Sequence, residues 1–199
     1  MSDIQFAIDL FEEIDEDYKI SNAVDKLSSR LKEGFNVNDK SELGYTPIML
    51  FASHFVDVAD IIDLLAQNGA DVNEKYYGSN QWLNGSNALH IALGEEDTHI
   101  NNIKKVISLG ADVNSPNDSK DYPIHEAVEN GHAKAIKILI NNGANIVEKN
   151  EYGDTPLELA MELTQIPVAL ALLQKAIFKG KFISSLITVI KNFSLLGED

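Results

Sequence analysis

The sequence contains no cysteine, a single arginine (Arg30) and a single tryptophan (Trp82). Without cysteine the chain has no disulfide, no thiolate metal site and no cysteine nucleophile, as is usual in the reducing cytosol. The acidic N-terminus lacks the basic and apolar regions of a secretory signal. No unbroken apolar run reaches the roughly 18 residues of a membrane-spanning helix. We therefore expect a cytoplasmic protein that makes no membrane contact.

Positive charge is scarce as well, because 16 Lys and Arg residues stand against 31 Asp and Glu residues and give a formal net charge of −15. Nucleic acids are bound through clustered Lys and Arg, so the composition argues against nucleic acid as a direct partner. Two interpretations of the acidity stay open. It either attracts a basic protein partner or only keeps the surface soluble.

The chain does contain a repeat. The segments GFNVN, GADVN, GADVN and GANIV begin at glycines 34, 69, 110 and 143, at spacings of 35, 41 and 33 residues. A second motif follows each one: TPIML, NALHI, YPIHE and TPLEL begin at residues 46, 87, 122 and 155. Each glycine predicts a helix end in the left-handed conformation, and the Thr-Pro pairs predict helix starts.

A period of about 33 residues, built from a turn and two helices and marked by TPLH-like motifs, resembles the ankyrin repeat over residues 34–176. The resemblance implies an all-α repeat solenoid of stacked helix pairs with β-hairpin fingers. We expect N-terminal capping helices at 1–38 and a C-terminal capping helix at 181–199. Between these caps we expect four repeats, at 39–73, 74–114, 115–147 and 148–180.

Three segments depart from the repeat. Thirteen residues, 74–86, form one junction where the other junctions have seven, and this extended finger carries Tyr76, Tyr77 and Trp82. These aromatics either bind a partner or, for Tyr77 and Trp82, pack on the neighbouring repeat. The inter-helix turns of the first two repeats are each about two residues longer than that of the third. Three roles stay open for the apolar helix after Gly180: it caps the stack, lies on a membrane surface or mediates a dimer contact. We expect it to cap the stack and the protein to be a monomer.

Motifs of catalysis are missing. The sequence has no GxSxG, no phosphate-binding glycine loop and no calcium loop, and in HEAVENGH the residue four after His125 is Glu129 rather than histidine. We expect no enzyme activity, no metal and no cofactor. His90 and His125 occupy the histidine position of TPLH, where the resemblance implies structural hydrogen bonds.

The resemblance also implies that the chain binds another protein through the concave side formed by the fingers and the first helices. Carried over by position, the expected contact residues are Tyr45, Ser53, His54, Tyr76, Tyr77, Trp82, Leu83, Asn84, Glu95, Asp121, Glu126, Glu129, Asn130, Tyr152 and Glu162. Carboxylates would speed encounter with a basic partner, and aromatics would supply affinity. Two other roles stay open: an immunity or inhibitor protein that neutralises a toxin, and a bacterial effector delivered into a host cell.

Overall fold

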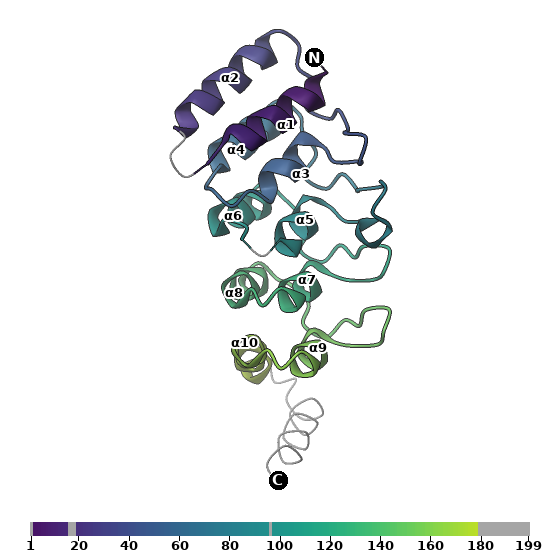
Figure 1. Cartoon of the computed structure of the whole chain (residues 1–199). Coiled ribbons are helices and arrows are strands. Elements are labelled where there is room, and N and C mark those ends of the chain that lie inside the picture. Colours follow the sequence, from purple (N-terminus) through teal and green to yellow (C-terminus); the bar gives the residue numbers. More distant parts are fainter. Residues whose placement is uncertain (1, 16–18, 96, 179–199) are drawn as a thin grey trace.

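The computed structural model describes residues 2–15, 19–95 and 97–178, with only the backbone of 174–178. Within this part of the chain, the helices form five pairs stacked in sequence order (Figure 1). The pairs are α1 (Asp3–Glu13) with α2 (Ile20–Lys32), α3 (Pro47–Ala52) with α4 (Ala59–Gln67), α5 (Ala88–Gly94) with α6 (Ile100–Ser108), α7 (Pro123–Glu129) with α8 (Ala133–Asn141), and α9 (Pro156–Glu162) with α10 (Ile166–Phe178). The expected helix at 181–199 lies outside the described residues.

The first helices of the pairs form one column and the second helices form the other (Figure 1). In the first column α1, α3, α5, α7 and α9 pack in turn, and the fingers project beside them. We use the name inner face for the surface formed by these first helices and the fingers. None of the helices in the described segments is long and apolar enough to cross a membrane.

The first helices after α1 are short, with six or seven residues each, and α5 packs against α6, α3 and α7. In α5 the residues from Ala88 to Leu93 are all buried. Burial along this helix shows no period of 3.6 residues, because the helix is covered on all sides. One pair alone could not bury such a helix, so the stack forms as a whole. This arrangement confirms the all-α repeat solenoid.

Two sets of hydrogen bonds explain why the repeated motifs recur. In three repeats the third residue of the first helix accepts a hydrogen bond from the backbone N–H just before the helix: His90 from Asn87, His125 from Tyr122, and Glu158 from Thr155. Both histidines also bond the next repeat, through Nε2 to the carbonyl oxygens of Asp121 (3.2 Å) and Asp154 (3.1 Å). Their expected structural role is confirmed, and burial lowers the pKa of His90 to about 3.

Asparagines in the glycine segments join successive repeats. The Nδ2 atoms of Asn38, Asn73 and Asn114 donate to the carbonyl oxygens of Gly69, Gly110 and Gly143 at 3.0–3.1 Å. Val147 takes the corresponding place in the fourth segment, after which the described residues contain no further loop of this kind. The asparagine therefore has a partner only where the next glycine loop lies beside it.

The fingers differ from the expected β-hairpins, since the described residues contain no strand. Each finger is closed by one or two backbone hydrogen bonds, such as Ser41 N–H to Tyr45 O at 2.9 Å in the first. Neighbouring fingers touch closely. A Cβ on Gly78 would overlap the carbonyl oxygen of Leu43, so glycine is required where the first and second fingers meet.

Candidate functional site

The predicted contact residues fall into three groups by exposure. The exposed ones are Tyr77, Trp82, Glu95, Glu129, Tyr152 and Glu162. The half-buried ones are Tyr45, Ser53, Leu83, Asn84, Asp121, Glu126 and Asn130. The remaining two, His54 and Tyr76, are buried, with relative exposures of 1% and 0%.

The prediction that His54 contacts a partner is wrong, because its ring is enclosed between two phenylalanines. It lies edge-on to Phe11 and is stacked on Phe55, with ring centroids 4.6 and 4.8 Å apart. Its Nε2 bonds to the carbonyl oxygen of Phe11 at 3.1 Å, and its Nδ1 accepts from the N–H of Val56 at 3.0 Å. Burial lowers the pKa of His54, so the ring is neutral at pH 7.

The prediction that Tyr76 contacts a partner is also wrong. Its ring packs on Tyr45, with centroids 4.9 Å apart, and its hydroxyl accepts from the N–H of Asn80 at 3.2 Å. Tyr76 therefore anchors the extended finger from inside. It also holds the finger's backbone, through hydrogen bonds to Ser86 O (2.7 Å) and from Gly85 N (2.9 Å).

The extended finger presents the other two aromatics to solvent. A short 3-10 helix, η1 (Gln81–Leu83), forms its tip, and Asn80 accepts from the N–H of Trp82 at 3.2 Å to start it. Tyr77 and Trp82 are 59% and 73% exposed. The alternative that these two side chains pack on the neighbouring repeat is therefore wrong, and Tyr76 alone has that role.

Three carboxylates gather on the inner face around α7, and we refer to Asp121, Glu126 and Glu129 as the acidic cluster. Burial, reinforced by the charges of Glu129 and Asp121, raises the pKa of Glu126 to about 8. Burial, and then the charge of Asp121, raises the pKa of Glu129. Burial also raises the pKa of Asp121, opposed by a hydrogen bond with Asn150 and assisted by the charge of Glu151. None of the three forms an ion pair within the described part of the chain. The cluster therefore has no counter-charge among the described residues, and at pH 7 Glu126, with its pKa of about 8, is mostly protonated.

A pocket of about 440 Å³ opens on the inner face where α1, α3 and α5 meet the turns that follow α3 and α5. We name it the inner-helix pocket. Its wall is apolar and aromatic, formed by Phe11, Tyr45, Leu50, Phe55 and Ile91. Its polar rim is formed by Ser53, Glu95, Asp97 and Thr98. Of these lining residues, the sequence predicted Tyr45, Ser53 and Glu95 as contacts.

The two lengthened turns build the rim of this pocket and are fastened to each other. The hydroxyl of Thr98 donates to Ser53 O at 3.1 Å, and the N–H of His99 donates to His54 O at 3.0 Å. The extra residues found in the sequence thus let the second turn reach back to the first. That difference in turn length was the only sequence signal for the pocket.

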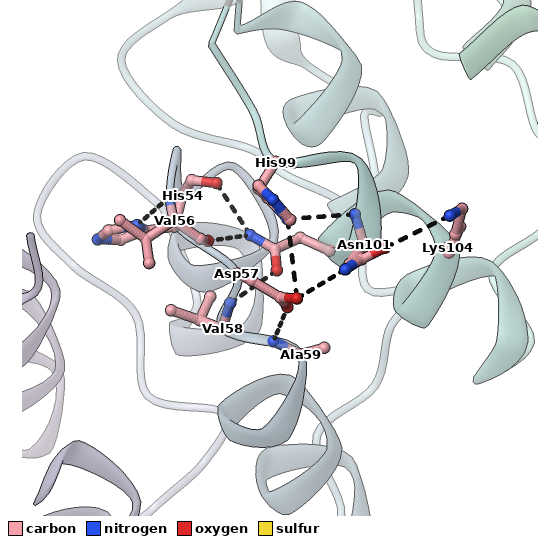
Figure 2. Close-up of polar contacts among 9 residues, drawn as sticks. His54, Val56, Asp57, Val58, Ala59, His99, Asn101 and Lys104 are labelled. Atoms are coloured by element: carbon pink, nitrogen blue, oxygen red, sulfur yellow. Dashed lines mark hydrogen bonds and ion pairs between the residues drawn. The ribbon is translucent and has the colours of Figure 1, made fainter. Parts of the chain in front are cut away.

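A buried asparagine completes the connection between the turns. Asn102, fully buried in α6, accepts from Val58 N at 2.9 Å and donates to His54 O and Val56 O at 2.9 and 2.8 Å. Figure 2 shows the surrounding contacts, in which Asp57 also accepts from Asn101 Nδ2 at 2.7 Å. Because each partner is satisfied, we interpret the network as a structural clamp.

Metal binding receives no support from the described residues, among which no group of three or more His, Cys, Asp or Glu side chains could hold an ion. A family model described as "Ankyrin repeats (3 copies)" matches residues 17–117 and again residues 95–182. The two matches together span most of the sequence and include every residue of the inner-helix pocket except Phe11. No curated protein matches the chain.

Proposed function

The chain belongs to the ankyrin repeat family, whose members are generally protein–protein interaction modules, and we propose that it is a non-enzymatic module that binds a basic protein through its inner face. The observation that carries this proposal is the uncompensated charge of the acidic cluster. Keeping three carboxylates together with no counter-charge costs stability, as the raised pKa of Glu126 indicates. Features that cost stability without a structural benefit are expected at functional sites.

A basic partner would supply the missing counter-charge. A Lys or Arg side chain placed at the acidic cluster would lower the pKa of Glu126 and favour its charged form. The exposed carboxylates Glu95 and Glu162 would attract the partner over a longer range and raise the association rate.

The exposed aromatics of the fingers supply a second kind of contact. Trp82 and Tyr152 are 73% and 71% exposed, and Tyr77 is 59% exposed. Large aromatic side chains with this exposure are common anchors of protein interfaces. Since the fingers are closed by their own hydrogen bonds, little entropy would be lost when a partner covers them.

Affinity capture with matched charge variants tests the proposal. The wild type, the inner-face variant E126Q/E129Q and the outer-face variant D25N/D60N are immobilised, and bound proteins are identified by mass spectrometry. Asp25 on α2 and Asp60 on α4 are exposed on second helices, so the control replaces two acidic side chains away from the inner face. We expect a basic protein that the wild type and D25N/D60N retain and that E126Q/E129Q binds at least about fivefold more weakly.

Equal retention by all three proteins would overturn the role of the acidic cluster. A retained protein that is itself acidic would overturn the proposed basic partner. For a captured partner, the association rate should fall as salt rises, because steering by exposed charge is screened over about 8 Å at physiological ionic strength. The identity of the partner would separate a general adaptor from an inhibitor of a basic toxin or an effector directed at host proteins.

A further inference from the structure

We propose that the inner-helix pocket takes an arginine side chain of the protein partner, with the alkyl stem along the apolar wall and the guanidinium beside Glu95 and Asp97. This inference rests on the proposed protein-binding function and names the chemistry that one part of the inner face would recognise. Three observations support it: the shape of the pocket, the charge of its lining, and the hydrogen bonds that hold Thr98 and His99 of its rim turn.

The pocket has room for a long side chain and a wall suited to one. Its volume of about 440 Å³ exceeds that of a single arginine side chain. Phe55, which lines the pocket, is stacked on His54 and is 47% exposed. An arginine stem packs well on apolar surface, and the planar, weakly hydrated guanidinium stacks favourably on an aromatic ring.

The charge of the pocket favours a cation. Glu95 and Asp97 both lie on the rim, and among the described residues no Lys or Arg lines the pocket. His54, which packs against the wall, is neutral at pH 7 for the reason given above. His132 bonds through its Nε2 to the carbonyl oxygen of the rim residue Glu95 at 3.0 Å. Burial, then the nearby Tyr76 and Glu95, raises the pKa of Tyr45. The negative charge of Glu95 thus interacts with the wall residue Tyr45, and the same charge would attract a cation in the pocket.

Part of the rim is already held in place before a ligand arrives. Thr98 and His99 are bonded to the backbone of the preceding turn, where Asn102 also bonds the carbonyl oxygens of His54 and Val56. Asp97 directly precedes Thr98, so its carboxylate loses less entropy on binding than one on a loose loop. An acidic side chain would be repelled from this rim, and a neutral one would leave both carboxylates without a partner.

Small probes test the pocket without knowledge of the partner. N-acetylarginine methylamide, its lysine analogue and its uncharged citrulline analogue are titrated into the ¹⁵N-labelled protein, and backbone amide shifts are followed. We expect the arginine probe to shift the amides of the turns at 53–55 and 97–99. Because an exposed charge contact is weak, the citrulline probe should bind about fivefold more weakly, and the lysine probe should fall between the two.

Variants locate the binding. E95Q/D97N should weaken the arginine probe about fivefold, since it removes the two rim charges while the apolar wall remains. D25N/D60N, which replaces two exposed carboxylates on second helices, should leave its affinity unchanged. Both residues of E95Q/D97N are exposed, so the spectrum of the variant should match that of the wild type apart from nearby amides.

Three results would each overturn the proposal. The citrulline probe could bind as tightly as the arginine probe, the lysine probe could bind more tightly than the arginine probe, or the amide shifts could avoid the two turns. Failure of this proposal is distinct from failure of the proposed function. If capture succeeds and the arginine probe does not bind, only the pocket assignment falls. If the probe binds and no basic protein is captured, the pocket stands as a site for the side chain and the proposed partner falls.

Discussion

Replacing Thr46 by valine is expected to stabilise the protein, although threonine is normally a favoured residue just before a helix. Thr46 precedes α3 and is 1% exposed, and its hydroxyl forms no hydrogen bond. The cause lies three residues later in the chain. The corresponding threonine of the fourth repeat, Thr155, bonds to Glu158, whereas the first repeat has Met49, whose thioether is at best a weak acceptor.

The magnitude follows from the missing partner. A buried hydroxyl without a hydrogen bond costs about 1–3 kcal/mol relative to its solvated state. Valine has nearly the same shape, with a methyl group in place of the hydroxyl, so the substitution removes this cost without opening a cavity. We expect the free energy of unfolding to rise by about 1 kcal/mol, which raises the melting temperature by about 2–4 °C for a chain of this size.

Urea unfolding followed by circular dichroism measures the effect, as a higher midpoint with an unchanged slope. Thr155→Val is the matched control. The hydroxyl of Thr155 donates to Glu158 Oε2 at 2.8 Å and accepts from Glu158 N at 3.3 Å, so its loss should lower the free energy of unfolding by about 1 kcal/mol. If the two variants lose stability alike, the hydroxyl of Thr46 has a partner and the reasoning is wrong.

Two further predictions concern the clamp and the acidic cluster. Asn102→Ala leaves Val58 N–H and Val56 C=O without a partner, and His54 O keeps only its bond from His99 N, so the variant should cost about 3 kcal/mol in urea unfolding. The half-buried neighbour Asn101→Ala should cost about 0.5–1 kcal/mol, and equal losses would contradict the clamp. Because the pKa of Glu126 is raised in the folded state, its contribution to stability is complete below about pH 4.5 and is lost as pH rises to about 8. Glu126→Gln should therefore raise the free energy of unfolding at pH 8 by about 1–2 kcal/mol, after allowance for solvent screening, and by much less at pH 5; an equal change at both pH values would contradict the raised pKa.

The fold could be predicted because its signals are local. A glycine that ends a helix and a Thr-Pro pair that starts one act within a few residues, so they can be found in the sequence before any packing is known. The recurring asparagine is different. Asn38 and its equivalents have no partner within their own repeat, and their role appears only when the next glycine loop lies beside them.

The exposure of the expected contact residues could be predicted only in part. Position in the repeat assigned Glu126 to the first helix and Tyr152 to the finger, but it could not decide which of Tyr76 and Tyr77 is buried. That choice is set by Tyr45 of the preceding finger, which packs on Tyr76. The pocket was missed for a similar reason, since Phe11, Phe55 and Asp97 come from three different helix pairs.

The two lengthened turns are best understood as a single feature. A long turn on its own would expose carbonyl groups that its own repeat cannot bond. In this chain the carbonyl of His54 accepts from both His99 N and Asn102 Nδ2, and that of Ser53 accepts from Thr98. The longer turn of the second repeat therefore satisfies the backbone of the first, which explains why both extensions occur in consecutive repeats. Together the two turns place Ser53, Asp97 and Thr98 at the rim of the inner-helix pocket. The departure from the repeat therefore also forms part of the pocket on the inner face.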